Sequence, residues 1–138
     1  MKALRLSLLA ASLAVFASDA HAADKIDCKK TDTLNQYQLD VCAGYDYTAA
    51  DGKLNALYRD LMSKYDTANG ALLKSAERAW LAYRDAECTY ETNGTVGGTI
   101  NPMMDTMCRT EKTNARIKEL ATQLKCPEGD LSCNMPVK

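Results

Sequence analysis

The sequence has little of what most enzyme chemistry requires, and it contains no long apolar run. Its 138 residues include one histidine, His21, near the start of the chain. No apolar stretch reaches the ~18 residues that a membrane-spanning helix needs. The charge is almost balanced, with 17 basic and 18 acidic residues, which argues against nucleic-acid binding because such proteins usually carry a basic face. The length fits one domain.

The first 22 residues have the pattern of a secretory signal peptide. Lys2 and Arg5 supply positive charge, residues 6–17 are apolar apart from two serines, and residues 20–22 read Ala-His-Ala, a cleavage pattern. Cleavage leaves residues 23–138 as a single exported domain, located in the periplasm or secreted. The exported part then has no histidine, which excludes serine–histidine and cysteine–histidine catalysis.

Apolar residues recur at helical spacing in three stretches, and no strand pattern competes with them. The sequence therefore predicts an all-α domain of three antiparallel helices, at residues 33–66, 71–91 and 102–124, with a short tail at 125–138. Their expected inner faces are Leu54, Leu57, Tyr58, Leu61, Met62 and Tyr65; then Leu72, Leu73, Ala76, Trp80 and Tyr83; and then Met103, Met107, Ile117, Leu120 and Leu124.

Capping and turn residues set the expected helix ends. Thr33 with Gln36 forms a capping-box pattern. Gly44 and Gly52 weaken the helical pattern of the first stretch, which leaves room for a bend or a break near Gly44. Residues 67–70 read as the turn to the second helix. Pro102 directly follows an asparagine that suits the cap of the third helix.

Antiparallel packing about that turn places Trp80 beside Leu57 and Tyr58. Arg84 lies one turn further along the same face and arrives level with Asp51. Because a partly buried arginine needs a carboxylate, the sequence predicts an ion pair between Arg84 and Asp51.

All six cysteines follow the proposed signal peptide, and an even number in a small exported chain predicts three disulfides. Cys88 lies near the end of the second helix and Cys108 near the start of the third, so the loop between them brings the two together. The remaining four cysteines allow three connectivities. Of these, reach along the chain favours Cys28–Cys42, and Cys126–Cys133 would close the tail.

Four motifs, in order along the chain, resemble those of the lysozyme inhibitor LprI-like family. They are residues 50–58 (ADGKLNALY), 78–88 (RAWLAYRDAEC), 97–99 (GGT) and 108–116 (CRTEKTNAR). The signature residues within the first two motifs are Asp51, Asn55, Tyr58, Trp80, Tyr83, Arg84 and Asp85. The resemblance implies an exported, all-helical, disulfide-bonded bacterial domain. It also implies a non-enzymatic protein that binds and blocks a peptidoglycan-degrading enzyme such as a lysozyme.

The glycine-rich loop between the second and third helices is the candidate binding segment. It contains no lysine or arginine, and the predicted Cys88–Cys108 bridge anchors both of its ends. A tethered loop loses less conformational entropy on binding, which suits an inhibitor. The residues expected to contact a partner are Thr95, Gly97, Gly98, Thr99 and Asn101. The simpler interpretation is that Gly97 and Gly98 only permit a tight turn between helices.

Other chemistries fit the sequence less well. Asp85 and Glu87 point in different directions on a helix, which argues against a glycosidase carboxylate pair. Methionines near position 105 offer soft ligands for Cu(I), but the helical spacing of Met103, Met104 and Met107 is typical of core packing. We therefore expect no metal, no cofactor, no nucleic-acid partner and no membrane insertion.

A protein partner is expected, and the sequence leaves the oligomeric state open. The alternative function is an envelope module that binds another protein or peptidoglycan without inhibiting lysozyme.

Overall fold

The computed structural model describes residues 26–127, 129–131 and 133. The proposed signal peptide, residues 1–22, lies outside these described residues, as does part of the tail. The chain forms three long helices, and no strand occurs in the described part, which confirms the all-α prediction. The elements are η1 (Thr31–Thr33), α1 (Gln36–Lys64), α2 (Thr67–Glu91), η2 (Asn93–Thr95) and α3 (Asn101–Gln123).

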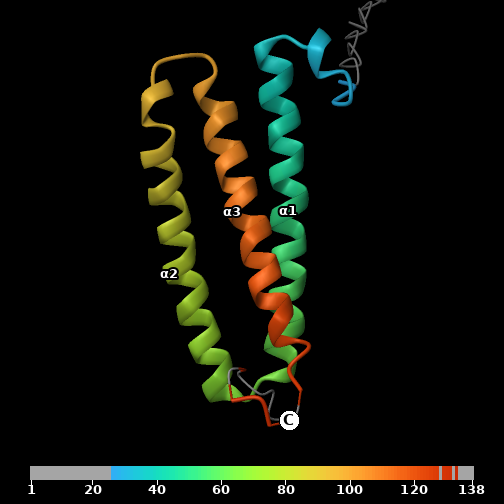
Figure 1. Ribbon diagram of the computed structural model, residues 1–138, viewed down its shortest axis with the longest axis vertical. Coiled ribbons are helices and arrows are strands. Elements are labelled where there is room, and N and C mark those ends of the chain that lie inside the picture. The colour runs from blue at the N-terminus through green and yellow to red at the C-terminus, as the bar shows by residue number, and fades with distance from the viewer. Residues whose placement is uncertain (1–25, 128, 132, 134–138) are drawn as a thin grey trace, which may run out of the picture.

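Consecutive helices are antiparallel, so that α1 and α3 run in the same direction and α2 runs against both (Figure 1). The closest packing is between α1 and α3, whereas α2 packs mainly on α3. The core lies where the three helices meet, and its buried members are Leu54, Leu61, Tyr65, Leu73 and Leu120. Trp80, Leu57 and Tyr58 all pack against this core.

Local hydrogen bonds move two helix starts away from the predicted positions. The capping box of α1 joins Asn35 and Gln38 rather than Thr33 and Gln36. Asp66 caps α2 by accepting a hydrogen bond from the backbone of Asn69 at 2.7 Å. The predicted turn at residues 67–70 is therefore the first turn of α2, and the real connection is shorter.

The interior of α1 and the start of α3 differ from the sequence prediction as well. α1 is one continuous helix through Gly44, so the chain does not break there. At the start of α3, Ile100 occupies the cap position and Asn101 is the first helical residue, with Pro102 inside the first turn. The side chain of Asn101 is thus released for contacts within the preceding loop.

The inner face of α2 carries charge, which the apolar pattern did not predict. Glu77 and Arg84 are buried together with Leu73 and Cys88. The predicted inner residues Leu72 and Tyr83 are instead 65% and 54% exposed, and Ala76 is exposed as well. Met107 of α3, predicted to be inside, is 51% exposed. Both buried charges of α2 are paired: Glu77 bonds Arg116 of α3, and Arg84 bonds the adjacent Asp85 of α2 itself.

None of the helices in the described part of the chain is long and apolar enough to cross a membrane.

Candidate functional site

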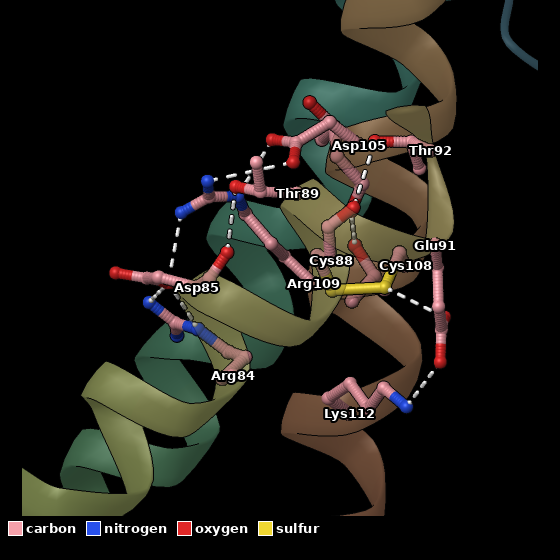
Figure 2. Close-up of a disulfide and its surroundings, with 12 residues drawn as sticks. Arg84, Asp85, Cys88, Thr89, Glu91, Thr92, Asp105, Cys108, Arg109 and Lys112 are labelled. Atoms are coloured by element: carbon pink, nitrogen blue, oxygen red, sulfur yellow. Dashed lines mark hydrogen bonds and ion pairs between the residues drawn. A yellow bond between two sulfur atoms is a disulfide. The ribbon is translucent and has the colours of Figure 1, made fainter. Parts of the chain in front are cut away.

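An ion-pair network holds the C-terminal half of α2, which leads into the loop, against α3. Arg109 of α3 donates to Asp85 at 2.8 Å and, through Nε, to Asp105 at 2.6 Å. Arg84 also bonds the Asp85 carboxylate, at 2.8 Å from Nη2 (Figure 2). The hydrogen bond that Arg109 donates to Asp105 raises the pKa of Arg109 above its ordinary value. Arg109 therefore keeps its charge at any physiological pH, and its bond to Asp85 helps to fix α2 beside the loop.

The predicted pair between Arg84 and Asp51 is wrong. The Arg84 guanidinium lies 5.3 Å from the ring centroid of Trp80 and 5.5 Å from that of Tyr47, and its carboxylate partner is the adjacent Asp85. Asp51 instead accepts a hydrogen bond from Asn55 at 2.7 Å. The physical reason is that α2 packs mainly on α3, so that α1 offers Arg84 an aromatic ring rather than a carboxylate.

The Cys88–Cys108 disulfide ties the end of α2 to the start of α3, as predicted. Its Cα atoms are 5.6 Å apart, and Cys88 is fully buried. The bridge lies beside the ion pair in which Lys112 donates to Glu91 at 2.7 Å (Figure 2). The hydrogen bond to Glu91 raises the pKa of Lys112. The pairs Cys28–Cys42 and Cys126–Cys133 are also present.

Two of the predicted contact residues hold the loop together from inside. Thr95 donates its hydroxyl to the carbonyl of Thr92 at 2.8 Å. Asn101 donates to the Thr95 hydroxyl at 2.8 Å and to the same Thr92 carbonyl at 3.3 Å. The donor groups of Thr95 and Asn101 are thus engaged within the loop and define its shape.

The other three predicted contact residues, Gly97, Gly98 and Thr99, are exposed. Gly97 has a φ of +86°, which side-chain-bearing residues rarely adopt. A Cβ at Gly98 would lie 3.2 Å from the carbonyl oxygen of Thr95. Both glycines therefore have a structural reason for their identity, and their backbone is open to contact.

Four apolar side chains beside these glycines are exposed, and sequence reasoning missed them as a surface. Val96, Ile100, Met104 and Met107 are 68%, 41%, 36% and 51% exposed; together they form what we call the loop-end surface. The last three recur at i, i+4 and i+7, so they follow one helical stripe. That stripe lies on a different side of α3 from the core residue Leu120, a signal that the sequence did contain.

A groove of about 800 Å³ continues from the loop-end surface along α3. Asp46 and Glu111 are exposed carboxylates in its wall, and neither has a hydrogen bond or ion pair to another described residue. The groove is lined by Ala43, Asp46, Glu91, Thr92, Met104, Met107, Cys108, Thr110, Glu111, Asn114, Ala115 and Lys118.

The methionines do not gather as a set of ligands. Met103 is partly buried and accepts a hydrogen bond from Gln36 of α1 at 3.8 Å, whereas Met104 and Met107 face outward. Among the described residues, no group of three histidine, cysteine or acidic side chains could hold a metal ion.

These features define a small three-helix domain stapled by disulfides, with an apolar surface at the end that carries its loop. The chain belongs to the lysozyme inhibitor LprI family, whose model matches residues 28–120. An uncharacterized protein of Rhizobium meliloti is 35% identical over 74% of this chain and 81% of that protein. No solved structure matches. The family resemblance is thus confirmed, and the disulfides indicate an extracytoplasmic protein.

Proposed function

We propose that this protein is an exported, non-enzymatic inhibitor that presses its loop-end surface into the cleft of a peptidoglycan-degrading enzyme. The observation that carries the proposal is the exposure of Val96, Ile100, Met104 and Met107 around a loop that is fixed internally. Membership of a family named for lysozyme inhibition supports an enzyme as the partner. Export by residues 1–22 would bring the protein to the periplasm or the exterior, where such enzymes act.

Rigidity supports this function. The loop is closed by Cys88–Cys108 and by the hydrogen bonds of Asn101 to Thr92 and Thr95. A surface that is already ordered loses little conformational entropy when it binds. Apolar side chains that are desolvated at the centre of an interface usually contribute most of its affinity.

Charge suggests which partner surface would fit. The carboxylates of Asp46 and Glu111 have no partner among the described residues and flank the apolar side chains of Met104 and Met107. A basic side chain at the rim of the partner's cleft would pair with them. The loop itself has no charged residue, so its contacts would be apolar or through backbone groups.

A lysis assay tests the proposal. The oxidised protein is titrated against lysozymes of different structural classes acting on cell walls, and inhibition of one class is expected to saturate near an equimolar ratio. Met107→Glu should weaken that inhibition at least ~10-fold, because it places a charge in the apolar contact. Ala56→Glu, on an exposed part of α1 far from the loop, is the matched control and should inhibit like the natural protein.

Failure of the assay has a defined meaning. If no class is inhibited by a folded, fully oxidised sample, the inhibitor function is wrong. Peptidoglycan pull-downs and capture of envelope proteins, both without added lysozyme, then test the alternative of an envelope interaction module. Loss of that binding in Met107→Glu would place it on the same surface.

A further inference from the structure

The outward side of α2 has no charged residue along almost its whole length. A quarter of all residues in the chain are charged, yet this side carries none over residues 72–90. All of its members are exposed, and we call them the outer α2 face: Leu72, Ser75, Ala76, Ala79, Ala82, Tyr83, Ala86, Thr89 and Tyr90. A solvated helix normally presents charged side chains on its outer side, so this face has the composition of a buried one.

The larger members are substantially exposed. Leu72, Tyr83 and Tyr90 are 65%, 54% and 78% exposed. Together with three alanines of the same face, these residues form a regular series: Leu72, Ala76, Ala79, Tyr83, Ala86 and Tyr90. Successive members are alternately four and three residues apart. This alternation is the seam along which two helices pack in a coiled coil. The described part of the chain supplies no helix to cover it.

We propose that the outer α2 face binds the same face of a second copy of this chain, with the two α2 helices antiparallel about a two-fold axis. The seam is self-complementary under this operation, because its spacing reads the same in both directions. Leu72 then lies opposite Tyr90 of the second copy, and Ala79 lies opposite Tyr83 of the second copy. Large side chains meet small ones at the centre, as an isologous interface requires.

Charges beside the face agree with this pairing. Arg78 and Asp85 both lie along one edge of the face, equally far from its centre to within about one residue, and Asp85 already pairs with Arg84 and with Arg109 of α3. Antiparallel pairing therefore brings Arg78 of each copy level with Asp85 of the other. Arg78 has no ion-pair partner among the described residues, and the side chain of Asp85 is 47% exposed. Parallel pairing would instead place Arg78 beside Arg78 of the second copy and Asp85 beside Asp85 of the second copy, so that like charges would meet.

The area is sufficient for a weak dimer. A tyrosine side chain buries about 150–250 Å², so the exposed parts of Tyr83 and Tyr90 amount to about 250 Å² per copy. Leu72 and the alanines add about as much again, so two copies together bury on the order of 1,000 Å², the lower limit for a specific interface. We therefore expect association at micromolar rather than nanomolar concentration. This inference does not depend on the proposed inhibitor function.

Sedimentation equilibrium of the oxidised protein, secreted with its own N-terminal segment, tests the proposal. The average mass is expected to rise toward twice the monomer value between ~1 and ~200 µM protein. Ala79→Glu should abolish this rise, since it buries two carboxylates at the centre of the interface. Glutamate favours helix, so the fold is expected to survive, and circular dichroism checks it. Ala56→Glu is the matched control and should still dimerise.

Cross-linking tests the antiparallel register. Ala76 lies opposite Ala86 of the second copy, whereas each is about 15 Å along the axis from its own counterpart, at 1.5 Å per residue. A mixture of Ala76→Cys and Ala86→Cys proteins should give a disulfide-linked dimer under mild oxidation, and neither variant alone should do so. The six natural cysteines are already bonded and serve as an internal check by mass spectrometry.

Three results would overturn the proposal: a monomer at ~200 µM, a dimer that survives Ala79→Glu, or cross-linking of Ala76→Cys with itself. If the protein is monomeric at ~200 µM and Ala79→Glu also loses lysozyme inhibition, the outer α2 face binds the target enzyme instead. Inhibition that persists in Ala79→Glu while dimerisation is lost would show that the two surfaces are separate.

Discussion

The buried carboxylate of Glu77 in α2 accepts hydrogen bonds from both Nε and Nη2 of Arg116 in α3. The two side chains are 11% and 17% exposed. Burial lowers the pKa of Arg116, but the hydrogen bonds that Arg116 donates to Glu119 and Glu77 outweigh this effect and leave its pKa above the ordinary value. This pair ties the N-terminal half of α2 to α3, whereas the network at Asp85 holds the C-terminal half.

Removing the carboxylate of Glu77 should destabilise the fold. We expect Glu77→Gln to lower the free energy of unfolding by about 3 kcal/mol, because Arg116 is left largely buried without its main counter-charge. Urea denaturation measures the change. Glu119→Gln is the control, since Glu119 bonds the same guanidinium from a side chain that is 62% exposed, and it should cost under ~1 kcal/mol. Equal losses in the two variants would contradict this assignment.

The disulfides should contribute unequally to stability and to inhibition. Replacing Cys88 and Cys108 together by alanine opens a loop with a separation of 20 residues and should cost about 3 kcal/mol. Replacing Cys126 and Cys133, which are 7 residues apart, should cost about 2 kcal/mol. In the lysis assay, the first double variant should lose potency and the second should keep it. The reverse order would move the binding surface to the tail.

Two glycines offer a test of backbone conformation. Gly52 lies inside α1 with open space where a Cβ would be, so Gly52→Ala should stabilise the protein by about 0.5–1 kcal/mol. Gly97→Ala should destabilise it by about 1 kcal/mol, because alanine rarely adopts a φ of +86°. Thermal unfolding under identical conditions compares the two variants. A stabilising Gly97→Ala would show that the loop does not hold this conformation in solution.

Stability should fall in alkaline solution, in part through Tyr65. This side chain is 4% exposed, and burial raises its pKa above the ordinary value of 10.0. The folded state therefore keeps the phenol proton at a pH where the unfolded state has lost it. Stability from this group is complete below pH 10 and is lost as the pH rises from there through the folded pKa. Lys112, whose pKa is also raised, acts in the same direction.

The variant Tyr65→Phe isolates that contribution. Melting temperatures measured from pH 8 to pH 11.5 should fall less steeply in Tyr65→Phe than in the natural protein, since phenylalanine has no proton to lose. Ala56→Gln, a change to a non-ionising side chain at an exposed position of the same helix, should retain the natural slope. A pH profile that Tyr65→Phe leaves unchanged would show that this tyrosine does not titrate with unfolding.

The helices could be predicted because their signals are local. Leu54, Leu61 and Tyr65 recur at helical spacing and are all buried. Cys88 and Cys108 could be paired because the loop between two helix ends leaves few other arrangements. These parts of the fold depend on short stretches of chain, which a single sequence describes well.

The partner of Arg84 could not be predicted, because it depends on how α2 leans between its two neighbours. Equal spacing from the turn between α1 and α2 suggested Asp51 as the partner. Because α2 packs mainly on α3, Arg84 instead pairs with Asp85, and Asp85 is bonded in turn by Arg109, which lies 24 residues after Asp85 in the chain. For the same reason the charged residue Glu77 is inside while Tyr83 is outside. In the loop, Thr95 and Asn101 have the right chemistry for a partner, yet their donor groups are already engaged, that of Thr95 with the carbonyl of Thr92 and that of Asn101 with the hydroxyl of Thr95.

The Cys88–Cys108 bridge also closes a covalent ring that contains the whole loop and the first turns of α3. A protease that cuts any peptide bond between these two cysteines opens the ring without releasing a fragment, because both new ends remain attached through the sulfurs. The two helices on either side also keep their contacts with the core. A compartment rich in proteases can therefore nick this exposed loop without dismantling the molecule, until a reductant separates the two sulfurs.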